Sequence, residues 1–213
     1  MKILIILAHP EPKSFNAAMY HSAIKTLEEN GHEVKTSDLY RMNFNPVSDR
    51  NNFTTMKNDA YFNQQAEEHF ANENNGFADD ILAEQDKVEW CDLMIWQFPL
   101  WWFSVPAILK GWVDKVFTMG RFYDNGRIYD TGMLKGKKAL LSLTTGGPEK
   151  NYVTTKYGSA DQVLHPIETG ILEFAGLTVL SPEINFSIER ITDEERKMIL
   201  EKWSHRLNHI FAE

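Results

Sequence analysis

The sequence contains a single cysteine, Cys91, among its 213 residues. An internal disulfide needs two cysteines, and small secreted domains often depend on several such bonds. The first residues, "MKILIILAHPEP", are briefly apolar, but His9 and Pro10 end the run without the small-residue cleavage site of a signal peptide. These absences exclude a disulfide framework, and we predict a cytoplasmic protein.

Basic residues are also scarce. The chain has 22 Lys and Arg against 30 Asp and Glu, which gives a net charge of −8 at pH 7. Nucleic acids and anionic membrane surfaces bind basic faces, so neither is an expected partner. The sequence also lacks an apolar run long enough to cross a bilayer, and we predict no membrane insertion.

Several ligand-binding motifs are missing as well. The sequence has no G-x-G-x-x-G and no Walker A pattern, which excludes a Rossmann dinucleotide loop and a P-loop. It has no Cys/His cluster with metal-ligand spacing, since Cys91 stands alone and His165, His205 and His209 fit surface or core positions better. We therefore predict no metal site.

Apolar, β-type runs alternate with helical patterns along the rest of the chain. Strands are expected at 2–8, 33–40, 92–98, 137–145 and 177–188. Helices are expected after Ser14, at 78–91, 105–117 and 160–176, and from a capping box at Thr192 and Glu195. This alternation predicts an α/β protein, a doubly wound, flavodoxin-like parallel sheet of five strands in the order 2-1-3-4-5.

One segment, at about 41–77, departs from this alternation. It is rich in Asn and Gln and lacks a sustained apolar stripe. We interpret it as a long surface insertion, and long ordered loops of compact domains are often functional. No repeat or linker interrupts the remainder, so residues 1–213 are expected to form a single domain.

Three loops should meet at one edge of this sheet. "AHPEPKSFN", "PLWWF" and "TTGGPEKNY" each follow the carboxyl end of a central strand, where ligands bind in such folds. The first loop opens a helix, whose free N–H groups favour a phosphate, although Ser14 could simply cap that helix. The glycines after the third strand allow a ligand to approach closely, but an ordinary turn would use them too.

The aromatic loop also has two possible roles, one in ligand binding and one in ordinary packing. Trp101 and Trp102 could form a flat wall for a planar ring, or they could point into the core. A phosphate-ready helix end, a glycine loop and an aromatic wall at one crevice together suggest a flat ring with a phosphate tail. A flavin fits that description.

Four segments carry a family likeness: "LAHPEPKSFN", "SDLYRMNFNP", "WQFPLWWFSVPAILKGWVDKVF" and "LSLTTGG". Together they resemble the NAD(P)H:quinone oxidoreductases, the DT-diaphorase family, and the likeness extends over essentially the whole chain. The resemblance implies a homodimer with FAD, less expectedly FMN, at the subunit interface. It also implies ping-pong transfer of a hydride from NADH or NADPH to a quinone-like acceptor.

The resemblance assigns roles by position. The residues expected to bind the cofactor are His9, Ser14, Phe15, Asn16, Ala18, Asn63, Pro99, Leu100, Trp101, Trp102, Phe103, Thr144, Thr145, Gly146, Gly147, Tyr152, Ile188 and Arg196. The acceptor is expected to contact Trp102, Phe103 and Tyr123. Catalytic assistance is expected from Tyr152, Gly146 and Tyr157, the last of which stands near the place of a histidine in vertebrate members.

Other functions are compatible with the same pattern. A flavodoxin-type carrier would shuttle single electrons and would need no substrate pocket. A redox-sensing regulatory subunit of a membrane transporter or an FMN-dependent azo- or nitroreductase would use the same fold. The tryptophan-rich loop and the insertion favour the quinone reductase, because a carrier exposes its flavin edge to partner proteins.

Overall fold

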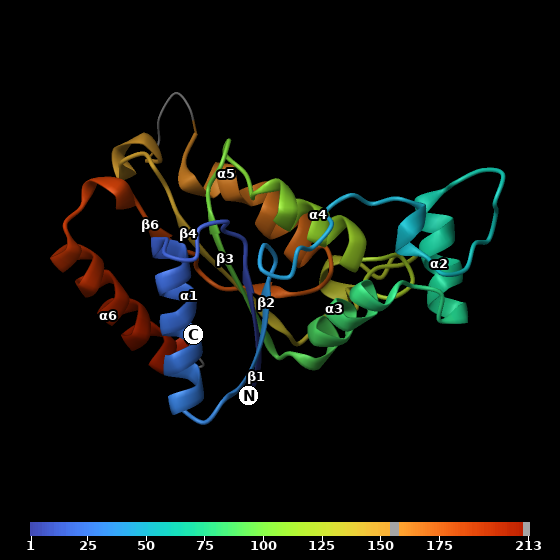
Figure 1. Cartoon of the computed structure of the whole chain (residues 1–213), viewed down its shortest axis with the longest axis horizontal. Helices are drawn as coiled ribbons and strands as arrows, with labels where there is room; N and C mark the ends of the chain where they lie inside the picture. The colour runs from blue at the N-terminus through green and yellow to red at the C-terminus, as the bar shows by residue number, and fades with distance from the viewer. Residues whose placement is uncertain (154–157, 211–213) are drawn as a thin grey trace.

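The computed structural model describes residues 1–153 and 158–210 and has a parallel β-sheet at its centre (Figure 1). The strands are β1 (Lys2–Leu7), β2 (Glu33–Asp38), β3 (Leu93–Pro99), β4 (Lys138–Thr144), β5 (Thr178–Val179) and β6 (Glu183–Asn185). Their order is β2-β1-β3-β4-β5, and β6 also pairs with β4. The predicted fold class and strand order are confirmed.

The fifth position of the sheet is shared by two short strands. Both β5 and β6 run parallel to β4, with Lys138 opposite Thr178 and Ser142 opposite Glu183. The single strand expected at 177–188 is therefore wrong in detail. Pro182 has no N–H for the ladder, so pairing stops before it and resumes beyond it.

Helices cover both faces of the sheet (Figure 1). The covering helices are α1 (Phe15–Glu29), α3 (Asp79–Trp90), α4 (Ala107–Val116), α5 (Ala160–Ile167), the π-helix η4 (Glu168–Glu173) and α6 (Asp193–His209), whereas α2 (Gln64–Asn74) lies in the insertion, away from the sheet. On one face, α1 and α6 pack over Ile3, Ile5 and Leu7 of β1. On the other face, α3, α4 and α5 enclose Leu4 and Ile6. Both faces of β1 are apolar because both are covered.

Two helix ends differ from expectation. Pro106 is the residue before α4 rather than part of its first turn, and its missing N–H costs nothing there either. Helix α5 continues through Pro166 and then widens into η4 one residue later. Since proline removes a backbone donor, the change of helix type directly after it is understandable. The capping box of Thr192 and Glu195 is confirmed at the start of α6.

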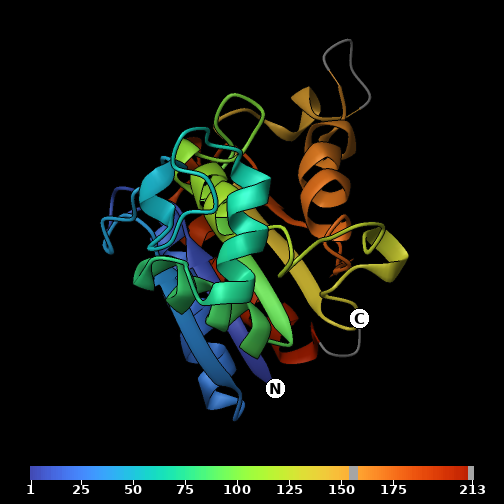
Figure 2. The same cartoon turned by 90° about the vertical axis from the view of Figure 1, so that its right-hand side faces the viewer.

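The insertion folds back on itself (Figure 2), and together with α3 it forms a small core apart from the two large ones. Phe53 and Phe77 pack with Ala71 of α2 and Ile81 of α3. Its first residues cross α4 at Gly111, where a Cβ would lie 2.2 Å from a backbone oxygen of the insertion. The segment is therefore more ordered than its Asn-rich sequence indicates. Across the described ranges 1–153 and 158–210, no helix has both the length and the apolarity needed to cross a membrane.

Candidate active site

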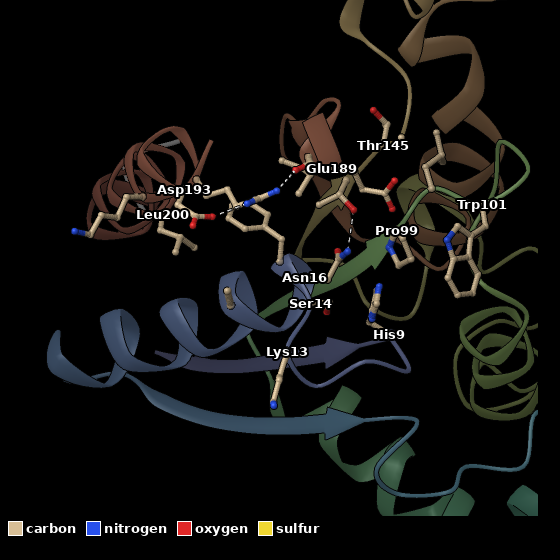
Figure 3. A pocket seen from close by; sticks show the side chains of 18 of the residues that line it. His9, Lys13, Ser14, Asn16, Pro99, Trp101, Thr145, Glu189, Asp193 and Leu200 are labelled. Atoms are coloured by element: carbon tan, nitrogen blue, oxygen red, sulfur yellow. Dashed lines mark hydrogen bonds and ion pairs between the residues drawn. The ribbon is translucent and has the colours of Figure 1, made fainter. Parts of the chain in front are cut away.

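The three predicted loops meet at a cavity of about 830 Å³ above the carboxyl ends of β1, β3 and β4 (Figure 3). Trp101 and Pro99 lie at one end, and Asp193 and Leu200 of α6 lie at the other. The predicted site residues that line the cavity are His9, Ser14, Phe15, Asn16, Ala18, Pro99, Leu100, Trp101, Trp102, Thr144, Thr145, Gly146, Ile188 and Arg196. The fold thus brings together most of the set that the sequence indicated.

The amino end of α1 forms the floor of the cavity. Ser14 caps the helix, and its hydroxyl accepts from the Ala17 N–H at 3.1 Å. The N–H groups of Phe15 and Asn16 nevertheless have no acceptor among the described residues. Free N–H groups and the helix dipole favour an anion, so capping and anion binding are compatible at this helix.

His9 borders the same floor. The backbone N–H of Glu11 donates to its Nδ1 atom at 3.0 Å, so the proton of the neutral ring is on Nε2. Burial lowers the pKa of His9, and the Glu11 contact and charge oppose this only in part. The neutral ring can therefore donate one hydrogen bond from Nε2 to a ligand oxygen.

A buried chain of amides supports the floor from below. Gln97 of β3 donates to the Asn16 side-chain oxygen at 2.9 Å, and Asn16 donates to the Thr144 hydroxyl at 2.8 Å. These bonds connect α1, β3 and β4 under the cavity, and Figure 3 shows Asn16 with its bond. Gln97 was not among the predicted residues, because a single glutamine inside an apolar strand gives no signal of its partners.

The aromatic loop is a tight two-residue turn. Trp101 and Ser104 exchange two backbone hydrogen bonds of 3.0 Å, and Trp102 and Phe103 between them have φ angles of 51° and 57°. Two left-handed residues in such a loop are the arrangement of a type I′ turn, which usually needs Asn or Gly. The Trp102 side chain is 97% exposed. The core-packing alternative is therefore wrong for this residue.

The glycine loop faces the aromatic turn. A Cβ on Gly146 would meet no protein atom within 4 Å, so its space is open to a ligand. The N–H groups of Gly146 and Gly147 have no acceptor among the described residues. Tyr152 packs beside them, with its ring centroid 6.3 Å from that of Phe103 and 5.5 Å from that of Phe186. This wall thus offers unpaired donors next to a phenol.

Some predicted residues lie elsewhere. Phe103, Gly147 and Tyr152 adjoin the cavity without lining it. Asn63 caps α2 in the insertion, where its side chain accepts from the Ala66 N–H. Tyr123 lines a second cavity, of about 380 Å³. Tyr157 lies outside the described residues.

The sequence analysis missed one end of the main cavity. Its additional lining residues are Lys13, Glu189, Asp193, Lys197 and Leu200. The capping box at Thr192 marked the start of α6 and could have indicated that its first turn faces the site. Among the residues that the structure describes, no cluster of His, Cys, Asp and Glu could hold a metal ion.

Comparison with known proteins identifies the family. A family model described as a flavodoxin-like fold matches residues 1–207. The chain is 46% identical over its whole length to a ribosyldihydronicotinamide dehydrogenase (quinone) of Mus musculus, and it covers 93% of that protein. It is 44% identical over its whole length to NAD(P)H dehydrogenase (quinone) 1 of Rattus norvegicus, and it covers 78% of that protein.

A solved structure agrees. A protein from Klebsiella pneumoniae, described as a candidate quinone reductase, has a TM-score of 0.92 and 35% identity, over 99% of this chain and 85% of that one. Two relatives above 40% identity and a structure of nearly the same shape thus share the whole chain. The protein belongs to the NAD(P)H:quinone oxidoreductase family, with a flavodoxin-like fold.

Proposed function

We propose that the protein is a flavin-dependent NAD(P)H:quinone oxidoreductase. Quinone reduction with NAD(P)H as electron donor follows from the family. The observation that supports a flavin is the set of unpaired N–H groups on two walls of one cavity, at Phe15 and Asn16 on one wall and at Gly146 on the other, with the Gly147 N–H next to it. A planar ring with acceptor atoms along its edge and a phosphate at its tail would supply hydrogen-bond acceptors to the N–H groups of both walls.

FAD is the flavin we propose. The cavity continues from the first turn of α1 past Ile188 to Arg196 and Leu200 of α6. FMN ends at its single phosphate, so this extension matches the second phosphate and the adenosine of FAD. Arg196 is held in place there by the Ile188 carbonyl at 2.9 Å and by Asp193 at 2.6 Å.

The side chains of this protein orient the reactants and stabilise charge. A bound flavin would supply the two-electron chemistry between NAD(P)H and the quinone. Trp102 and Phe103 would line the place of the reactants, and they would exclude water once a second copy covers the aromatic turn. The Gly146 and Gly147 N–H groups and the Tyr152 hydroxyl stabilise negative charge at the ring edge, and fixed donors of this kind often make the largest contribution to catalysis.

We also propose a homodimer that completes each site. Trp102 is almost fully exposed, and Asn63 and Tyr123 lie outside the main cavity of their own chain. A second copy would bring its insertion or its 120–130 segment against the aromatic turn. Light scattering tests this, and a stable monomer with full flavin content and activity contradicts it.

The central experiment identifies the cofactor and the acceptor. Heat releases bound flavin from the purified protein, and mass spectrometry then separates FAD from FMN. Steady-state oxidation of NADH and of NADPH is measured with a quinone, a nitroaromatic compound and an azo dye. We expect FAD and quinone-dependent turnover.

The other candidate functions predict different results. An electron carrier is inert without a reductase, a sensor turns over slowly, and an azo- or nitroreductase prefers the other acceptors. The absence of bound flavin would refute the proposed function. The cytoplasmic location stays a prediction.

A further inference from the structure

Helix α2 buries two neighbouring carboxyl groups, Glu67 and Glu68, although the helix is polar overall. The Glu67 carboxylate accepts from the backbone N–H groups of Lys57 at 2.5 Å and Asn58 at 3.0 Å, within the insertion itself. Buried carboxylates are costly unless they are hydrogen-bonded. Each of the pair should therefore have a specific structural task.

Glu68 reaches out of the insertion. Its carboxylate accepts from the backbone N–H of Met119 at 2.8 Å and from the Gln64 side chain at 2.9 Å. Burial raises the pKa of Glu68. The Tyr123 hydroxyl also interacts with this carboxyl group, and that contact lowers the pKa by a smaller amount. Glu68 thus accepts hydrogen bonds from Gln64 of α2 itself and from Met119, the first residue of the segment 119–123.

That segment is folded around the tyrosine. Met119 and Tyr123 form an isolated parallel β-bridge, and the Gly120 N–H donates to the Tyr123 carbonyl at 2.8 Å. Gln65 of α2 donates to the Tyr123 hydroxyl at 3.4 Å, and the Tyr123 ring lies 5.6 Å from that of Phe174. One end of the segment and its aromatic tip are therefore both attached to α2.

We propose that Glu68 is a positioning residue for the acceptor site, fixing the orientation of Tyr123 through the segment 119–123 and thereby selecting acceptors by size. The proposal rests on the proposed function, in which the 120–130 segment of a second copy lies against the aromatic turn, and on the prediction that its Tyr123 contacts the quinone there. Only a carboxylate presents two acceptor oxygens to these donors, because a glutamine has one acceptor and adds two donors of its own. Glu68→Gln should therefore remove one of the hydrogen bonds while keeping a side chain of nearly the same volume.

Glu67→Gln is the matched control, since Glu67 is adjacent and similarly buried, and its partners among the described residues are residues 57 and 58 rather than the segment 119–123. The assay is kcat/KM for 1,4-benzoquinone and for 1,4-naphthoquinone with the flavin-loaded protein. Glu68→Gln should lower kcat/KM by about five- to tenfold, the effect of one lost hydrogen bond, and should change the ratio between the two quinones. Glu67→Gln should leave both values within about twofold while lowering the melting temperature similarly.

Tyr123→Phe tests the route of the effect. If Glu68 acts through Tyr123, the double variant with Glu68→Gln should be no slower than the worse of the two single variants. Independent, multiplying losses would overturn the proposal. Equal kinetics for the Glu67 and Glu68 variants would overturn it as well.

Hydrogen exchange separates this inference from the proposed function. The Met119 amide should lose protection in Glu68→Ala but keep it in Glu67→Ala, whether or not the protein reduces quinones. Unchanged Met119 protection refutes the positioning role by itself. A parent protein that loads flavin but fails to reduce either quinone refutes the proposed function, and with it the acceptor part of this inference, while the exchange result still decides the structural part.

Discussion

The aromatic turn stores backbone strain that a glycine would release. Trp102 has a φ of 51°, in the left-handed region that L-residues with a Cβ rarely adopt. Trp102→Gly and Trp102→Ala both remove the ring, but only glycine also removes the steric cause of the strain. The difference between these two variants therefore measures the strain, reduced by the extra entropy that glycine loses on folding.

The size of the difference follows from two opposing effects. A left-handed conformation costs a residue with a Cβ about 1–2 kcal/mol. Glycine loses about 0.5–1 kcal/mol more entropy on folding. Trp102→Gly should thus exceed Trp102→Ala in unfolding free energy by about 1 kcal/mol, which is about 2–4 °C in melting temperature for a chain of this length.

Flavin binding should change in a different way. Because both variants lose a ring worth about 1–3 kcal/mol of contact, both should bind flavin or acceptor more weakly, by about five- to 150-fold. Thermal unfolding of the flavin-free protein and flavin titration measure the two effects separately. If Trp102→Ala is as stable as Trp102→Gly, the strain is no larger than the entropy cost of glycine, about 0.5–1 kcal/mol, and the prediction is refuted. If the dissociation constants for flavin and acceptor are unchanged in both variants, the Trp102 ring does not contact either molecule.

Three further predictions concern single residues. Tyr152→Phe should slow flavin reduction, measured by stopped flow, by at least about tenfold, which is about 1.4 kcal/mol of barrier. An unchanged rate would show that the Tyr152 hydroxyl does not stabilise the developing charge. Because burial raises the pKa of Glu68, its contribution to stability is present below pH 4.5 and is lost as pH rises through the raised value. Urea unfolding at a series of pH values should show this decrease in unfolding free energy in the parent protein but not in Glu68→Gln. If the unfolding free energies of the two proteins change with pH in parallel, the prediction is wrong. Gly132→Ala should cost about 1–3 kcal/mol, since its Cβ would lie 2.5 Å from the Gly176 backbone, whereas Gly170→Ala has free space; equal melting temperatures would refute this.

The topology could be predicted because each central strand is a continuous apolar run and because several helices begin with a recognisable signal, such as Ser14 for α1 and Thr192 for α6. The site followed from topology, since carboxyl ends of parallel strands share an edge. The sequence could not separate Trp96 and Trp112, which are buried, from Trp101 and Trp102, which face outward. Burial depends on the turn between strand and helix, and the left-handed geometry of that turn has no sequence signature when its residues are aromatic.

The insertion was the least predictable part. Glu67 and Glu68 look like ordinary surface residues of a polar helix, and their burial depends on backbone donors that lie far from them or in irregular loops. Hydrophobic periodicity contains no information about such partners. The predicted role of Tyr157 stays a prediction, because this residue lies outside the described ranges.

The separate small core of the insertion has an evolutionary consequence. Phe53, Ala71 and Phe77 pack with one another and with Ile81, and the two large clusters on the sheet do not include them. Substitutions among these core residues of the insertion can therefore accumulate without disturbing the strands that carry the loops of the cavity. Lineages of such enzymes can diverge in the acceptors they accept while the cavity above the sheet stays the same.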